Sequence, residues 1–182
     1  MHYITTFSKT RFSPVSPETA DIKIEDIGHA LSLLCRANGH IRYFFSIAQH
    51  SLNCAYEAKA RGYADKLQLA CLLHDASEAY LSDITRPVKA QLPEYRKIED
   101  HLQSMVYSKF LHEPLTSEEI TAVDQIDDAM LYYEFRALMG ETVFDVPPQI
   151  KSAPCFCTRD FGEVEAEFLS AFLSLTGHTA RI

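Results

Sequence analysis

The sequence predicts an all-α protein that forms one compact domain with a short N-terminal arm or hairpin. Apolar residues recur at intervals of three and four through most of the chain, which is the period of an amphipathic helix. The 182 residues, 47% of them hydrophobic, suffice for one domain with a sizeable core. The charged fraction of 23% is ordinary for a soluble protein. We therefore treat residues 1–182 as a single domain.

The N-terminal third is expected to contain the arm and three helices. The first twenty or so residues are rich in β-branched and turn-forming types and lack a helical period, which favours a hairpin or an arm. A helix should begin at Ile24 and end near Asn38-Gly39. The next should run from near Ser46 to Gly62. Residues 67–76 are apolar nearly all round, so this helix should lie at the centre of the fold.

The rest of the chain predicts further helices separated by two loops. Two prolines interrupt residues 82–93, so this segment should be a loop with at most one helical turn. Residues 145–160 hold three prolines and two cysteines and should form a surface loop. Helices are expected over 94–111, from the Thr116 and Glu119 capping box to near Gly140, and over 164–175.

Composition excludes several classes of partner. The net charge of −8 and the lack of a basic stripe argue against a nucleic-acid polymer. No apolar run approaches the roughly 18 residues of a membrane span, and no basic start precedes an apolar stretch. We expect a cytoplasmic protein whose five cysteines are reduced. The Cys155-Phe156-Cys157 segment lacks the two-residue spacer and the second pair of a structural zinc site.

The strongest functional signal is His74-Asp75, which directly follows the apolar run 69–73. A His-Asp pair delivered to an interior by a buried helix indicates a cation. His50 and Asp127, each inside its own predicted helix, would complete a set of two imidazole nitrogens and two carboxylate oxygens. Such a set suits one divalent metal ion with open coordination positions.

Two members of this set have ordinary alternatives. A lone helical histidine such as His50 is more often a hydrogen-bonded core or surface residue. Asp127 has acidic neighbours, Asp124 and Asp128, and all three could form a solvated face. Asp127 adjoins Ile126 and so borders the buried stripe, whereas Asp124 should face solvent; Asp128 is the second choice of ligand.

The order His50, His74-Asp75, Asp127 resembles the H…HD…D signature of the HD-domain metal-dependent phosphohydrolases. Residues 73–83 and 86–89 resemble the bacterial 5′-deoxynucleotidase branch and its phage relatives, some of which hydrolyse dATP. Val123 to Asp127 resembles the last metal-ligand motif of that branch. The likeness spans roughly residues 24–139, which the resemblance marks as the core of an HD-domain helical bundle.

The resemblance implies an enzyme that hydrolyses phosphate from (deoxy)nucleotides, either a dNMP 5′-nucleotidase or a dNTP triphosphohydrolase. One metal ion would serve it, and a mixed nitrogen and oxygen set accepts Mn, Co, Zn, Fe, Ni or Mg. Glu78 lies one turn after His74 and is expected to shuttle a proton or orient water. Asp83 is its catalytic partner by family analogy. The alternatives are a surface carboxylate for Glu78 and a helix cap for Asp83.

Basic and polar residues around the metal motif are the candidate substrate contacts. Arg36 resembles the phosphate-contacting arginine of the family, and His40, Arg86 and Lys89 could add positive charge. Asn38 could contact a sugar or base, or could simply end its helix. Ala37 follows Arg36 where the deoxynucleotidase branch carries tryptophan, so strict monophosphate specificity is not implied. By analogy we expect a homo-oligomer, a dimer or larger.

Two alternatives to a nucleotidase remain open. Another small phosphate ester or a signalling nucleotide could be the substrate. A catalytically weak nucleotide-sensing or scaffold module could keep the metal site without turnover. The presence of both Glu78 and Asp83 favours an enzyme, because a binding module has no need of a proton-transfer pair.

Overall fold

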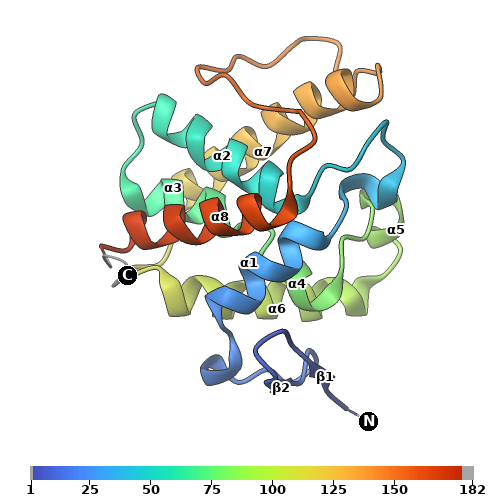
Figure 1. The fold of residues 1–182 in the computed structure, drawn as a ribbon. Helices are drawn as coiled ribbons and strands as arrows, with labels where there is room; N and C mark the ends of the chain where they lie inside the picture. Colours follow the sequence, from blue (N-terminus) through green and yellow to red (C-terminus); the bar gives the residue numbers. More distant parts are fainter. Residues whose placement is uncertain (1, 178–182) are drawn as a thin grey trace.

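Helices form the body of the protein, and a small hairpin extends from it at the N-terminal end (Figure 1). The computed structural model describes residues 2–177, so Met1 and residues 178–182 of the predicted domain lie outside the described residues. The elements are β1 (Ile4–Thr5), β2 (Arg11–Phe12), η1 (Thr19–Asp21), α1 (Ile24–Leu33), η2 (Arg36–Gly39), α2 (Ile47–Ala60), α3 (Asp65–Leu73), α4 (Glu78–Leu81), α5 (Arg86–Lys89), α6 (Pro93–Phe110), α7 (Ser117–Leu138) and α8 (Phe161–Leu175). The predicted all-α class with an N-terminal hairpin is confirmed.

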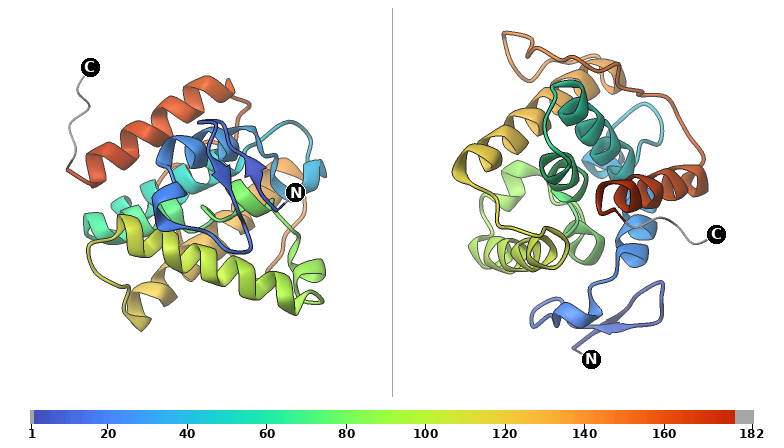
Figure 2. Two further views of the ribbon diagram at one scale, coloured as in Figure 1. Left: turned by 90° about the horizontal axis from the view of Figure 1, so that it is seen from below. Right: turned by 90° about the vertical axis from the view of Figure 1, so that its left-hand side faces the viewer.

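The core is centred on α3, as its all-round apolar sequence predicts. Every residue from Leu67 to Leu73 is buried. Helix α3 lies against α2, α6, α7 and α8, and α8 crosses the front of α2 and α3 in Figure 1. Figure 2 shows α6 along the side of the bundle from which the hairpin extends. A helix enclosed in this way holds the residues at its end in fixed positions, because they cannot move without disturbing the packing around them.

The hairpin is packed onto the helices by aromatic side chains and by hydrogen bonds. Its strands pair antiparallel, with Ile4 opposite Phe12. The Phe12 ring is fully buried and stacks on Tyr80 of α4 at 4.0 Å between ring centroids. The buried Asp26 carboxylate of α1 accepts hydrogen bonds from the Ser8 backbone N–H at 2.6 Å and from the Ser8 hydroxyl at 2.9 Å. The hairpin therefore belongs to the domain.

The predicted end of the first helix at Asn38-Gly39 is wrong, because α1 ends at Leu33. The chain then becomes extended, and Cys35 forms a bridge with Ser46. The Arg36 backbone N–H donates to the carbonyl of Phe45 at 2.9 Å. These backbone hydrogen bonds to the start of α2 replace helical ones. Their consequence is that Arg36 is held beside the helix that carries His50.

The amphipathic pattern of α6 predicted only a packing role, but this helix also forms hydrogen bonds to the turn after α3. The Gln103 side chain donates to the carbonyl of Leu73 at 2.8 Å and accepts from the backbone N–H of Ser77 at 3.1 Å. These bonds tie both ends of the turn that contains His74 and Asp75. The predicted capping box of α7, Thr116 with Glu119, is confirmed.

Two further features of the fold concern the loop over residues 82–93 and the capacity of the helices to span a membrane. The predicted loop over residues 82–93 contains the single helical turn α5, in accordance with the sequence. Within residues 2–177, none of the helices combines the length and the apolar character that crossing a bilayer requires.

Candidate metal centre and its cavity

The four predicted metal ligands converge on one point, although they come from three separate parts of the chain. His50 lies on α2, His74 and Asp75 follow the end of α3, and Asp127 lies on α7. The His50 Nε2 atom is 3.1 Å from His74 Nε2, 3.1 Å from Asp127 Oδ1 and 3.7 Å from Asp75 Oδ2. The His74 Nε2 atom is 3.3 Å from Asp75 Oδ2 and 3.7 Å from Asp127 Oδ1.

The hydrogen bonds of the two imidazoles fix which nitrogen faces the centre. His74 Nδ1 lies 2.8 Å from the backbone carbonyl of Cys71, which can only accept, so Nδ1 carries a proton. His50 Nδ1 lies 2.6 Å from Glu134 Oε1 and donates to that carboxylate. In the neutral imidazoles both Nε2 lone pairs therefore point at the same place.

This donor set fits a divalent cation. A metal ion with bonds of about 2.0–2.2 Å to nitrogen and oxygen places neighbouring ligand atoms roughly 3.0–3.6 Å apart. Of the five distances among His50, His74, Asp75 and Asp127, three (3.1, 3.1 and 3.3 Å) lie within that range and two (both 3.7 Å) lie just above it. The two Nε2 lone pairs and the carboxylate oxygens beside them repel one another unless positive charge lies between them.

The pKa values of His74 and Asp127 are shifted by the charges and hydrogen bonds of their neighbours in this cluster. Burial alone would lower the pKa of His74, but the attraction of Asp75 and Asp127 outweighs it and raises that pKa to about 9. Burial would raise the pKa of Asp127, yet hydrogen bonds from His50 and His74 hold it well below its usual range. A metal ion must displace the imidazole protons, because only the neutral ring is a ligand.

Cys54 is a further candidate ligand that the sequence analysis treated as a small hydrophobe. His50, Cys54 and His74 form a group within residues 2–177 that could hold a metal ion. The Cys54 sulfur lies 3.6 Å from His50 Nε2, and the i+4 spacing after His50 was the available signal. Burial raises the pKa of Cys54 to about 12, so the thiol stays protonated. The carboxylates of Asp75 and Asp127 are therefore the better donors, because a metal binds cysteine in its thiolate form.

Glu134 is the most important residue that the sequence analysis missed. It lies two turns after Asp127 on α7, and this i+7 spacing places both side chains on one face. Its side chain is buried, and one oxygen accepts from His50 Nδ1. The other oxygen accepts from Arg36 Nη2 at 3.3 Å, while Arg36 Nη1 lies 3.4 Å from Asp75 Oδ2. Glu134 therefore links the metal centre to the predicted phosphate arginine.

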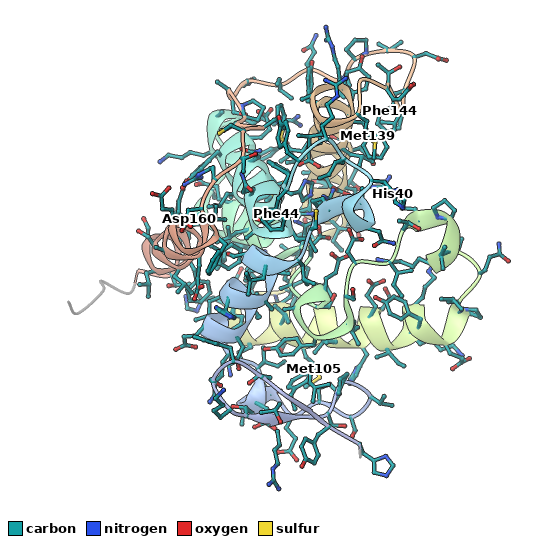
Figure 3. All side chains as sticks on the ribbon, turned by 45° about the vertical axis from the view of Figure 1, so that its right-hand side comes forward. His40, Phe44, Met105, Met139, Phe144 and Asp160 are labelled. Carbon is teal, nitrogen blue, oxygen red and sulfur yellow. The ribbon has the colours of Figure 1, made fainter. Side chains whose placement is uncertain are left out.

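A cavity of about 410 Å³ adjoins the metal centre and is lined by both charged and apolar residues. Figure 3 shows Phe144 beside the C-terminal end of α7, where Met139 lies. The charged lining residues are Arg36, Asp75, Glu78, Asp83, Arg86, Lys89, Asp127 and Glu134, and the apolar ones, called here the apolar wall, are Ala37, Ile41, Ile84, Pro87, Leu131, Phe135, Leu138, Val143 and Phe144.

The predicted catalytic residues Glu78 and Asp83 both line this cavity. Glu78 is only 4% exposed, and its Oε2 atom lacks a hydrogen-bond partner within residues 2–177. Burial, and then the negative charges of Asp75 and Asp83, raise the pKa of Glu78 well above its usual range. A buried carboxyl group in that state can hold a proton and release it to a neighbour in the cavity.

The two predicted basic residues of the loop reach the cavity but already contact carboxylates. Arg86 donates to Asp127 Oδ2 at 2.9 Å and to Asp128 Oδ1 at 3.0 Å. Lys89 Nζ lies 2.6 Å from a Glu99 oxygen and 3.6 Å from a Glu78 oxygen. Both cations therefore partly neutralise the acidic edge of the centre. Asp128, the second choice of ligand, binds Arg86 instead.

The structure does not bring Asn38 and His40 into the cavity. Both side chains are exposed, and their neighbours Ala37 and Ile41 line the cavity in their place. Asn38 has a left-handed backbone with φ of 51° and follows Ala37 in the same conformation. Of the two interpretations of Asn38, this geometry favours a turn residue.

A second cavity of about 400 Å³ also adjoins the candidate metal ligands and is acidic. It shares Asp75, Glu78, Lys89 and Asp127 with the first and adds acidic groups from α6 and α7. Those further carboxylates are Glu99, Asp100 and Asp124. An anionic ligand will therefore favour the first cavity, which contains Arg36.

Comparison with known proteins gives two relatives. No family model matches the chain. The chain is 34% identical to the uncharacterized protein YfdR of Escherichia coli (strain K12) over 159 residues, which cover 81% of this chain and 86% of YfdR. It is 39% identical to the uncharacterized protein RCAP_rcc00048 of Rhodobacter capsulatus over 109 residues, which cover 57% of this chain and 55% of that protein. The likeness to YfdR thus extends over most of both chains.

Proposed function

The chain belongs to the family of YfdR, and we propose that it is an HD-type, metal-dependent phosphohydrolase that removes phosphate from deoxynucleotides. The observation that carries the proposal is the pair of imidazoles whose Nδ1 atoms are both occupied by acceptors. Their Nε2 atoms converge with two carboxylates beside a cavity that contains an arginine. A divalent ion bound there would polarise a phosphate oxygen and offset the charge that develops on the phosphoryl group.

The residues around the centre supply the other functions that phosphate hydrolysis requires. Arg36 is anchored by Asp75 and Glu134, so its guanidinium lies at the inner end of the cavity without a large entropy loss on binding. It is suited to hold phosphate oxygens there. Glu78 and Asp83 line the same cavity, where one can hold a proton while the other orients the attacking water.

The apolar wall supports a nucleotide in preference to a small, fully polar phosphate ester. Phe135 and Phe144 line the same cavity as the charged residues. A ligand that spans the cavity therefore needs an anionic end and a flat apolar end, and a nucleotide has both. Ala37 at the cavity edge is small and leaves room beside the arginine. This room is compatible with either one phosphate or several.

The test is release of phosphate and larger phosphate products from a panel of deoxy- and ribonucleotides. Protein stripped of metal is resupplied separately with manganese, cobalt or zinc. We expect metal-dependent turnover of deoxynucleotides that Asp75→Ala abolishes. The product distinguishes a monophosphatase from a triphosphohydrolase.

The Glu78→Ala variant separates an enzyme from a binding module. It should lose turnover and keep its metal affinity, because Glu78 lies beside the metal ligands without being one. Glu94→Ala is the matched control, since Glu94 is an exposed carboxylate on α6. Absence of turnover with every metal, together with tight metal binding, would contradict the enzyme and support a sensor or scaffold.

A further inference from the structure

The phosphohydrolase proposal leaves the Cys155 and Cys157 pair without a role. Their sulfur atoms lie 2.7 Å apart, and both residues are exposed. Non-bonded heavy atoms usually stay roughly 3.5–4 Å apart, whereas a disulfide brings its sulfurs to about 2.05 Å. By contrast Cys54 and Cys71 are buried, and Cys35 is half-buried. The pair is therefore both close and accessible.

The local backbone explains why the two sulfurs meet. From 151 to 157 the residues alternate between exposed and half-buried, which is the pattern of an extended chain. Residues two apart in such a chain project to the same side. Phe156, between the two cysteines, packs at 6.2 Å from the Phe45 ring, and its carbonyl accepts from the Tyr43 hydroxyl at 2.7 Å. Anchoring Phe156 inward turns both thiols outward.

Helix α2 holds this extended segment along its length. Three polar side chains spaced four residues apart on one face of α2 bind its backbone. The hydrogen bonds join Gln49 Nε2 to the carbonyl of Cys157 (3.0 Å), Asn53 to the N–H and carbonyl of Cys155 (3.3 and 3.1 Å), and Glu57 to the N–H groups of Lys151 and Ser152 (3.0 and 2.8 Å). A backbone fixed at three points has little conformational entropy left to lose when its two thiols join.

The two thiols also differ in acidity in a way that assigns their order of reaction. A hydrogen bond from the Cys157 thiol, with a smaller contribution from the Arg159 charge, lowers the pKa of Cys155. The same sulfur contact raises the pKa of Cys157. Cys155 is therefore the thiolate that attacks first.

We propose that Cys155 and Cys157 are a reversible dithiol–disulfide pair that reacts with low-molecular-weight disulfides. The Cys155 thiolate attacks one sulfur of the small disulfide, forms a mixed disulfide and expels one thiolate. The Cys157 sulfur then attacks Cys155, gives its proton to solvent, forms the protein disulfide and expels the second thiolate. Two electrons pass from the protein to the oxidant, and the two expelled thiolates take up protons from solvent to become two small thiols.

The experiment equilibrates the reduced full-length protein in buffers of defined ratios of glutathione disulfide to glutathione. Free thiols are then alkylated and the protein is analysed by mass spectrometry. We expect a species lighter by two hydrogen atoms, with the disulfide between Cys155 and Cys157 and the other three cysteines alkylated after denaturation. Cys35→Ser, the matched control, should oxidise like the wild type, and Cys157→Ser should stop at the mixed disulfide on Cys155.

The same titration in urea measures what the fold contributes. The folded protein should show an effective thiol concentration at least about tenfold above that of the unfolded chain, because the backbone is held in place. Asn53→Ala should reduce that ratio. Equal values in the folded and unfolded wild type would overturn the proposal. Stable mixed disulfides on both cysteines, or oxidation that involves Cys35, would overturn it too.

Discussion

Replacing Glu134 by glutamine tests how the metal centre is organised. One oxygen of this buried carboxylate lies 2.6 Å from His50 Nδ1, and the other lies 3.3 Å from Arg36 Nη2. An amide has a single acceptor oxygen, so Glu134→Gln can serve His50 or Arg36 but not both. Whether the amide oxygen accepts from His50 or from Arg36, the amide NH₂ group then faces the other donor. The variant therefore loses one hydrogen bond to a charged or polarised group and gains a donor–donor contact.

The magnitude follows from the place of Glu134 behind a ligand. Loss of the carboxylate that orients a ligating histidine costs roughly 10- to 100-fold in metal affinity, or about 1.4–2.7 kcal/mol. We expect Glu134→Gln to weaken binding of manganese or zinc within that range. Competition against a chromogenic chelator measures it directly. The ¹⁵N chemical shifts of His50 should also show that the Nδ1-protonated tautomer is less populated.

Glu165→Gln is the matched control. Glu165 accepts from His29 Nδ1 at 2.9 Å in a half-buried pair on α1 and α8, on elements that contribute none of the four ligands. It should leave metal affinity unchanged. A folded Glu134→Gln protein, verified by circular dichroism, that bound metal as tightly as the wild type would refute the positioning role of Glu134.

Three further predictions concern Asp127, Arg36 and Glu57. Asp127→Asn should weaken metal binding by more than the roughly 10- to 100-fold expected for a residue that only hydrogen-bonds a metal ligand. Asp128→Asn should change metal affinity little, as measured by isothermal titration calorimetry. Equal losses in the two variants would show that the wrong aspartate was chosen. Arg36→Lys should raise the KM for a deoxynucleotide roughly tenfold while metal affinity is retained, because an ammonium cannot match a planar guanidinium on phosphate; an unchanged KM would remove Arg36 from the substrate site. Glu57 is buried, which by itself raises its pKa, but the hydrogen bonds that it accepts lower the pKa overall. The hydrogen bonds to ionised Glu57 therefore stabilise the fold at pH values above the pKa that Glu57 has in the unfolded chain. This stabilisation is lost as the pH falls through the lower pKa that Glu57 has in the folded protein. Glu57→Gln should reduce the free energy of unfolding at neutral pH by about 1.5–3 kcal/mol and flatten the acid limb of urea-denaturation curves, and an unaltered pH profile would contradict this.

The sequence predicted the helices well because their periodicity is a local property. The choice of Asp127 over Asp128 as a ligand stays a prediction; the structure places Asp127 Oδ1 3.1 Å from His50 Nε2, whereas Asp128 pairs with Arg86. The end of α1 was wrong because the bridge between Cys35 and Ser46 is a tertiary contact, which no local pattern at Asn38-Gly39 could reveal.

The structure brings the four candidate ligands together as the sequence predicted, but the sequence did not reveal their surroundings. His50, His74, Asp75 and Asp127 stood out because their residue types are unusual in apolar helices. Glu134 did not, although its i+7 spacing from Asp127 was readable, because a single carboxylate on a long helix is most often exposed. The apolar wall was missed because Val143 and Phe144 belong to a loop whose path depends on the whole fold.

The measurement that tests the metal centre most directly is an anomalous-scattering map of crystals grown with manganese. It should show one peak bonded to His50 Nε2, His74 Nε2, Asp75 and Asp127, with bonds of about 2.0–2.3 Å. A peak at Cys155 and Cys157, or none between the two imidazoles when binding in solution is saturated, would contradict the proposed centre.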